Sequence, residues 1–294
     1  MANREAIQSF VLFNSESTGL PQTRPRIIEL SFIAVTRDAL LNLGARSTPR
    51  VLNKLTLCFN PKKDIEEEAA GVNGFTDLHR ADLELMKTFE NAASLVISFL
   101  ESLPRPVCIV AHYGNSFHFR LLLAELKRAR QDIPEHILRV DSHMALRALE
   151  KLKPLSEYTG RNTSDESVSR RRREGLSLSD VKDEPLDGRM REGLSLSDVK
   201  DEPLDGRMRE GLSLSDVKDK PLDGSGAENK SSGKLSYKLT AVHSRMFGPE
   251  GEECHTAENR CKTLLKIVLA LSESFIEWCD DKAQPLNTVG LMRI

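Results

Sequence analysis

The order of hydrophobic patterns along residues 5–153 restricts this chain more than any other feature. Three strand-like runs come first, and helical and strand-like spacings then alternate. The strand-like runs are 7–13, 26–35, 51–59, 107–110 and 137–140, and the helical runs are 85–103, 117–129 and 142–152. A meander of strands followed by alternating helices and strands predicts an α/β protein with a five-stranded sheet covered by helices.

The alternating pattern stops at Pro154, and residues 154–233 have a different composition. They are polar and rich in Ser, Asp, Glu, Arg and Gly. An 18-residue unit, REGLSLSDVKDEPLDGRM, occurs twice from residue 173, and a third copy that ends at residue 224 reads REGLSLSDVKDKPLDG. Each copy has too little apolar surface to offset the loss of chain entropy. We therefore expect a disordered insert between residues 1–153 and closing helices within 234–294.

The overall composition is that of a water-soluble protein. Hydrophobic residues make up 39% and charged residues 29%, and the net charge is −2, so any nucleic-acid-binding surface must be local. The five cysteines are scattered and form no Cys-x-x-Cys pair, which favours reduced thiols in a cytoplasmic or nuclear protein. The apolar run 264–271 is short and contains Lys266, so we expect no membrane span.

Four short motifs occur in order along the chain. They are FNSESTGLP at 13–21, VAHYGNSFHF at 110–119, VDS at 140–142 and HTAENR at 255–260. With their flanks they resemble the DEDDh-type 3′–5′ exonucleases, in particular the TREX group of three-prime repair exonucleases. The resemblance covers nearly all of the chain except 154–233. It implies an RNase H-like exonuclease fold, a mixed five-stranded sheet flanked by helices, and a homodimer through the exposed edge of strand 51–59.

In that family, four carboxylates hold two divalent metal ions and a histidine acts as general base. Matched motif by motif, the chain retains Glu16, a metal-binding and catalytic position, and the catalytic His255. The other three carboxylate positions are occupied by Asn14, His118 and Arg260. Mg²⁺ needs charged oxygen ligands, and at an effective dielectric near 20 each such contact is worth roughly 4 kcal/mol. The residues therefore predict a catalytically inactive homologue that uses no cofactor.

Two alternatives keep an active enzyme open. The first is a 3′–5′ DNA exonuclease with a weakened Mg²⁺ or Mn²⁺ site that releases nucleotides from 3′ ends. The second is a single transition metal held by Glu16 and His118, with His255 as base. Against both, Arg260 opposes a cation nearby. Arg260 itself has two interpretations: it occupies the vacated metal position and grips a phosphate, or it points to solvent.

The resemblance also indicates nucleic-acid contacts. In the family, the turn that corresponds to Thr18, Gly19 and Leu20 touches the terminal nucleotide, and here Leu20 either wedges against a base or only packs. His112 and Tyr113 lie in the second motif, and Tyr113 replaces the family's usual Asn. The interpretation favoured is an inactive module that binds single-stranded or 3′-end DNA, or a protein partner, in the cytoplasm, the nucleus or both.

The repeats carry a further signal. Lys182 and Lys200 each lie in a Val-Lys-Asp-Glu sequence, the apolar-Lys-x-Glu pattern that the SUMO-conjugating enzyme recognises on exposed chains. In the third copy Lys220 replaces the Glu, so Lys218 is expected to be a poorer acceptor. The alternative is that the repeats form a solvated spacer. The basic run 170–173 is a candidate nuclear-localisation or phosphate-contacting cluster.

Overall fold

One mixed sheet of six strands runs through the middle of the fold, in the order β3-β2-β1-β4-β5-β6. The strands are β1 (Ser9–Ser17), β2 (Ile27–Thr36), β3 (Asn53–Cys58), β4 (Val107–Ala111), β5 (Leu138–Asp141) and β6 (Gln284–Pro285). β1, β4 and β5 are parallel, whereas β2, β3 and β6 each pair antiparallel with a neighbour. This is the mixed, helix-flanked sheet that the sequence predicts.

The structure, a computed structural model, describes residues 5–42, 48–75, 77–160, 235–249 and 255–292. The repeats, with Lys182, Lys200 and Lys218, lie outside the described residues, as does the run 170–173. The first residues of the expected insert, 154–160, lie within the described residues, and there packed structure continues past Pro154. Leu155 opens the 3₁₀ helix η3 (Leu155–Gly160) and is fully buried.

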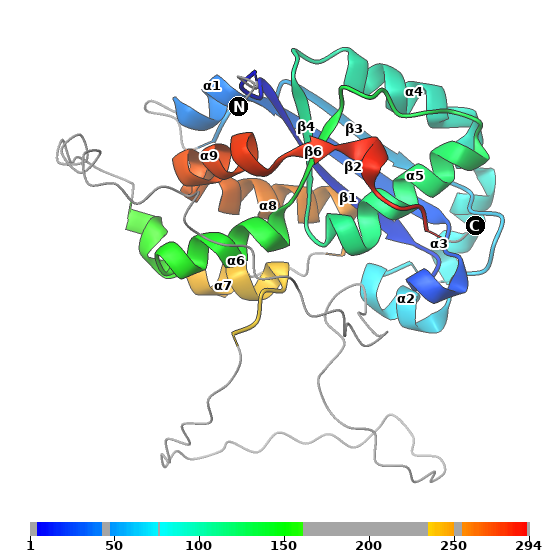
Figure 1. Cartoon of the computed structure of the whole chain (residues 1–294). Helices are drawn as coiled ribbons and strands as arrows, with labels where there is room; N and C mark the ends of the chain where they lie inside the picture. The colour runs from blue at the N-terminus through cyan, green and yellow to red at the C-terminus, as the bar shows by residue number, and fades with distance from the viewer. Residues whose placement is uncertain (1–4, 43–47, 76, 161–234, 250–254, 293–294) are drawn as a thin grey trace, which may run out of the picture.

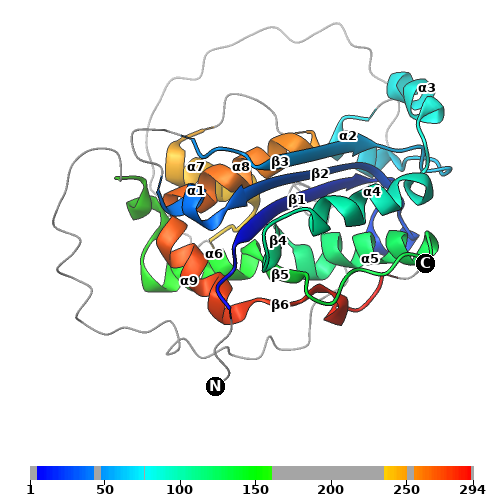
Figure 2. The ribbon, with the colours of Figure 1, turned by 90° about the horizontal axis from the view of Figure 1, so that it is seen from above.

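Helices cover both faces of the sheet (Figures 1 and 2). Those before the expected insert are α1 (Arg37–Leu41), which lies between β2 and β3, α2 (Glu67–Asn73), α3 (Asp77–Leu85), α4 (Phe89–Glu101), α5 (Phe119–Arg128) and α6 (Ser142–Leu152). The closing helices are α7 (Leu239–Phe247), α8 (Ala257–Ala270) and α9 (Ser272–Lys282). Short turns of other helix types are η1 (Pro21–Thr23), the π-helical η2 (Gly114–His118) and η6 (Leu286–Thr288).

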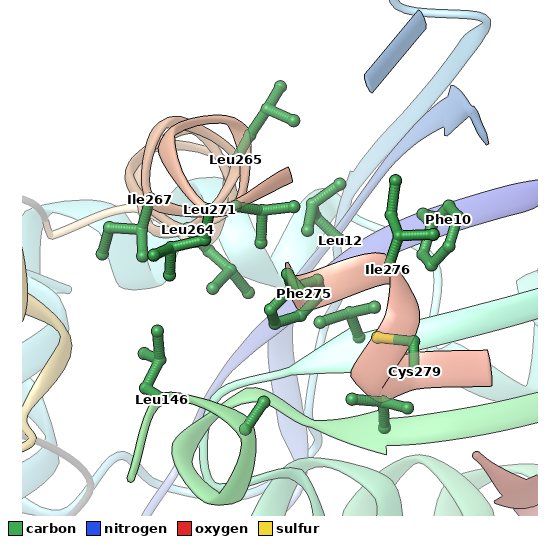
Figure 3. Packing of buried hydrophobic residues seen from close by; sticks show 14 of the residues in the cluster. Phe10, Leu12, Leu146, Leu264, Leu265, Ile267, Leu271, Phe275, Ile276 and Cys279 are labelled. Atoms are coloured by element: carbon green, nitrogen blue, oxygen red, sulfur yellow. The ribbon is translucent and has the colours of Figure 1, made fainter. Parts of the chain in front are cut away.

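Two hydrophobic cores lie on opposite faces of the sheet, because side chains alternate along a strand. On β1, Phe10 and Leu12 pack with α6, α7, α8 and α9, as Figure 3 shows for part of this cluster. Val11 and Phe13 point the other way and pack with α4 and α5. The closing helices therefore complete the same domain, since one face of β1 would be uncovered without them.

The structure differs from the sequence prediction in three places. A sixth strand, β6, pairs with β5 through Leu138 and Arg139; its two residues include a proline and show no alternating pattern. The helical run 85–103 is interrupted, because Leu85 ends α3 and α4 begins only at Phe89. Helices α1, α2 and α3 were not predicted; α1 and α2 are short, and only the last residue of α3, Leu85, falls within a predicted helical run.

Parallel pairing brings the motifs to one edge of the sheet. Phe13 of β1 pairs with Ala111 of β4, which pairs with Asp141 of β5. The first three motifs therefore meet at the carboxyl ends of adjacent strands. Helix α8, which carries the fourth motif, packs across β1 and β2, and the Thr256 side chain caps its first turn by accepting the Asn259 N–H.

Candidate functional site

A small cavity lies where the motifs meet. Its volume is about 30 Å³, which is room for a single water molecule. The lining residues are Asn14, Ser15, Glu16, His112, Tyr113, His118, Lys238, Leu239, Thr240 and Arg260. The structure therefore brings all four carboxylate positions of the resemblance, including the three substituted ones, around one cavity.

The centre of this site is an ion pair between Glu16 and Arg260. The Arg260 Nε atom lies 3.0 Å from Glu16 Oε1, and the Asn14 side-chain amide donates to the same oxygen at 3.0 Å. Arg260 is only 8% exposed, so the solvent-facing interpretation of this residue is wrong. The helical position of Arg260 on α8 directs its side chain over the end of β1, where the carboxylate compensates its charge.

Glu16 has a second acidic neighbour that motif matching missed. Glu29 on β2 is the register partner of Glu16 on β1, and both side chains are buried. Burial raises the pKa of Glu16 to about 7; the charge of Glu29 adds to this rise, whereas Arg260 and Asn14 oppose it. Burial also raises the pKa of Glu29. The cross-strand pairing of two glutamates becomes visible only once the register of β1 against β2 is known.

His118 and His112 are both neutral in the folded protein. The Nδ1 atom of His118 lies 3.0 Å from Ser15 Oγ, and burial lowers the pKa of His118 to about 3, with Arg260 adding to the decrease. Burial also lowers the pKa of His112 to about 3. Its ring nitrogens lie 3.0 Å from Ser142 Oγ and 2.8 Å from the Tyr237 carbonyl oxygen. These contacts tie β4 to α6 and to the segment before α7.

Asp141 holds the loop of the second motif in place. Its carboxylate accepts the backbone N–H groups of Asn115 and His143, each at 3.0 Å, and so also caps α6. Burial raises the pKa of Asp141 to about 6, against the lowering effect of these hydrogen bonds. Tyr113 takes the left-handed conformation (φ 57°) at this loop, which is costly for a residue with an aromatic side chain. The anchored loop thus holds the Tyr113 ring in a fixed place.

That ring belongs to an aromatic and basic cluster beside the cavity. Tyr113 and His143 stack with ring centroids 4.5 Å apart, and His143 meets Tyr237 edge-on at 6.1 Å. The guanidinium groups of Arg147 and Arg245 lie 5.8 and 5.5 Å from the Tyr237 ring. Of these five residues only Tyr113 lies in one of the four motifs, because the others come from α6, α7 and the segment before α7.

The turn of the first motif is tightly packed. Thr18 is fully buried, its N–H donates to the Arg26 carbonyl oxygen, and its own carbonyl accepts the N–H of Glu66. A Cβ atom at Gly19 would lie 2.4 Å from the Glu66 carboxyl group, so a larger residue here would require the Glu66 side chain to move. Leu20 is partly buried. These contacts account for the shape of the turn and leave the nucleotide-contacting role of Leu20 as a prediction.

His255 lies at the end of the site and does not line the cavity. Its Nδ1 atom is 3.1 Å from the Val72 carbonyl oxygen, and its Cβ packs near Gly74 at the end of α2. The structure therefore places the retained histidine beside α2, and its role as a general base stays a prediction.

The residues present do not fit the family's two metal ions. Within the described ranges, no group of three His, Cys, Asp or Glu side chains is arranged to hold a metal ion. Among the residues that the structure describes, Glu16 is the only carboxylate that lines the cavity, and the Arg260 guanidinium is already paired with it. In the same described ranges, no helix is both long enough and apolar enough to cross a membrane.

Comparisons with known proteins agree with this geometry. No family model matches the chain. It is 36% identical to human three prime repair exonuclease 2 over 157 residues, which is 51% of this chain and 66% of that relative, just under two thirds of its length. It is 26% identical to human three-prime repair exonuclease 1 over 295 residues, 97% of this chain and 71% of that relative.

The chain is similar in sequence to the three-prime repair exonucleases.

Solved structures of low sequence identity show the same exonuclease fold. A 3′-exonuclease that recognises the 3′ end of a histone mRNA stem-loop superimposes with a TM-score of 0.53 at 9% identity, covering 93% of this chain and 85% of that chain. Exonuclease I of E. coli, bound to a dT13 oligonucleotide, also gives a TM-score of 0.53, at 13% identity over 91% of this chain and 41% of that chain. These two solved structures thus share the overall fold of this chain.

Proposed function

We propose that this protein is a TREX-like 3′–5′ exonuclease homologue that binds nucleic-acid ends without cleaving them. The observation that supports it is the buried ion pair between Arg260 and Glu16. Phosphodiester hydrolysis by two metal ions needs carboxylates that are free to bind cations. In this site the one carboxylate that lines the cavity is already neutralised by a side chain of the same protein.

The substituted residues do not restore the missing charge. Asn14 uses its amide as a donor to Glu16, and His118 is neutral with a pKa of about 3. A Mg²⁺ ion at the cavity would meet one carboxylate and one guanidinium, so repulsion offsets attraction.

The aromatic and basic cluster supports a nucleic-acid ligand. Single-stranded nucleic acids bind surfaces that combine aromatic rings for base stacking with cations for the phosphates. Tyr113, His143 and Tyr237 supply the rings, and Arg147 and Arg245 supply the cations. Arg147 is exposed. Contact at this cluster needs no metal ion.

The alternative is an active, metal-dependent 3′–5′ DNA exonuclease with a weakened site. The retained Glu16 and His255, and the names of the matched relatives, favour it. Digestion of a labelled single-stranded DNA with Mg²⁺ or Mn²⁺ separates the two proposals. We expect no shortening by the wild-type protein. Metal-dependent shortening that disappears in both Glu16→Ala and His255→Ala would establish the active enzyme instead.

A separate experiment tests whether Arg260 binds a phosphate of the nucleic acid directly. Single-stranded DNA is titrated into wild type and Arg260→Ala without metal ions. We expect equal affinities, because the guanidinium is 8% exposed and contacts Glu16. A weaker complex of a correctly folded Arg260→Ala variant would support the grip.

Further parts of the proposal concern assembly and regulation. We propose a homodimer through β3, which is an edge strand of the sheet. We also propose a protein partner as an alternative ligand of the module, SUMO conjugation at Lys182 and Lys200, and a location in the cytoplasm, the nucleus or both. These four proposals rest on the sequence patterns. Pull-down with quantitative binding tests the protein partner, modification-site mapping tests the SUMO conjugation, and imaging of the tagged full chain tests the location.

A further inference from the structure

We infer that Arg260 is a tethered counter-ion that replaces the family's metal ions for two carboxylates, Glu16 and Glu29. This inference goes beyond nucleic-acid binding. It predicts that the Arg260 guanidinium occupies a place where one divalent cation could bind if the arginine were removed. It rests on the mismatch between the metal chemistry of the family and the residues found in this chain.

The two glutamates form one acidic pair. Glu16 and Glu29 are register partners on antiparallel strands, so their side chains lie on the same face of the sheet, the face that α8 covers. They are 4% and 6% exposed. Two buried carboxylates this close repel each other and are costly to keep in a folded protein without a cation.

Arg260 supplies that cation from α8. Its Nε lies 3.0 Å from Glu16 Oε1, and its charge also favours the ionised form of Glu29. Further hydrogen bonds complete the arrangement, since the Ala257 N–H donates to Glu29 Oε2 at 2.9 Å. A guanidinium on the same chain cannot dissociate, so the charge balance of this site is independent of the concentration of divalent ions.

Removal of Arg260 exposes a ligand set that suits a hard cation. Two carboxylates on adjacent strands would then border the cavity and the space that the arginine side chain leaves. Mg²⁺ and Mn²⁺ bind carboxylate and water oxygens, and one or two carboxylates are enough to hold such an ion. The variant should therefore gain a response to divalent cations that the wild type lacks.

The test is thermal unfolding of the metal-stripped full chain at pH 8, with MnCl₂ compared with NaCl of equal ionic strength. We expect the Tm of the wild type to be unchanged by Mn²⁺. Arg260→Gln should unfold at lower temperature without metal and recover by about 5 °C with Mn²⁺. Arg260→Lys, which keeps a cation, should show no response to Mn²⁺.

A second substitution locates the ion. In Arg260→Gln/Glu29→Gln the recovery should disappear, because one of the two carboxylates is gone. The inference is overturned if Mn²⁺ raises the Tm of the wild type, if folded Arg260→Gln does not respond, or if the double variant still does. Mn²⁺ binding by the wild type without DNA cleavage would overturn this inference alone, whereas metal-dependent cleavage would overturn the proposed function as well.

Discussion

The ring of His143 on α6 stacks against the ring of Tyr113 in the second motif, with the two ring centroids 4.5 Å apart. The pair joins a helix to a loop, and the Asp141 carboxylate accepts one backbone N–H from each, that of Asn115 in the loop and that of His143 in the helix. Because the loop is anchored, the Tyr113 ring is presented in one orientation against His143. A pre-ordered ring loses little entropy when a base stacks on it, which favours binding.

The first prediction concerns this cluster. Tyr237→Ala should weaken binding of single-stranded DNA about tenfold, because stacking on one aromatic ring contributes about 1–3 kcal/mol. The backbone contact between the residue-237 carbonyl oxygen and His112 remains in this variant. Fluorescence anisotropy with a labelled oligonucleotide, without metal ions, measures the loss.

Two arginine variants, one inside the cluster and one outside it, serve as controls for the DNA-binding measurement. Arg147 lies in the cluster. Arg105 is exposed just before the amino end of β4, whereas the motifs meet at the carboxyl ends of the strands. Arg147→Ala should lower the affinity and its dependence on salt, since a phosphate contact is lost. Equal affinities for Arg147→Ala and Arg105→Ala would show that the cluster does not contact DNA.

The second prediction concerns the pH dependence of stability. Burial lowers the pKa of His118 from 6.5 to about 3, so the unfolded chain binds a proton below pH 6.5 that the folded protein does not. The stability contributed by neutral His118 is therefore present above pH 6.5 and is lost as the pH falls towards 3. The loss is about 1.4 kcal/mol per pH unit, or roughly 2 kcal/mol at pH 5.

Urea unfolding of wild type and His118→Asn at pH 7 and pH 5 measures this effect. Glu16 and Asp141 have raised pKa values and act in the opposite direction, so the comparison is made between variant and wild type at each pH. The free energy of unfolding of His118→Asn should fall less between the two pH values. The same change in both proteins would mean that His118 titrates normally in the folded state.

The third prediction concerns the core behind the site. Phe275 of α9 is fully buried in the cluster that covers Phe10 and Leu12 of β1 (Figure 3). Phe275→Ala should lower the free energy of unfolding by about 3–5 kcal/mol, because it removes apolar contacts and leaves a cavity. Leu85→Ala is the control, since Leu85 is 82% exposed, and its effect should stay within about 0.5 kcal/mol.

The fourth prediction concerns the edge strand. Asn53 and Cys58 are exposed at the two ends of β3, which pairs with β2 on its other side. Asn53→Lys/Cys58→Lys should convert the proposed dimer to a monomer, because like charges meet across a two-fold axis. Light scattering after size exclusion measures the mass. Glu277→Lys on the exposed side of α9 should leave the mass unchanged, and a monomeric wild type would refute the proposed dimer.

The sequence by itself determined the architecture and the loss of the acidic groups. Hydrophobic spacing located β1 to β5 and most helices, because period-two and period-3.6 patterns are local properties of the chain. Asn14, His118 and Arg260 could be read as substitutions because each lies within a recognisable motif. The two-residue β6 was missed, since two residues carry no periodicity.

Only the tertiary structure decided what these residues do to one another. It turned Arg260 towards Glu16, placed Glu29 opposite Glu16, and brought His143 onto Tyr113. None of these contacts is encoded in a local pattern, because each depends on strand register or on how a helix packs over the sheet. The positive charge that balances Glu16 comes from Arg260, which is far away in sequence, and only the packing of α8 over the sheet reveals this pairing.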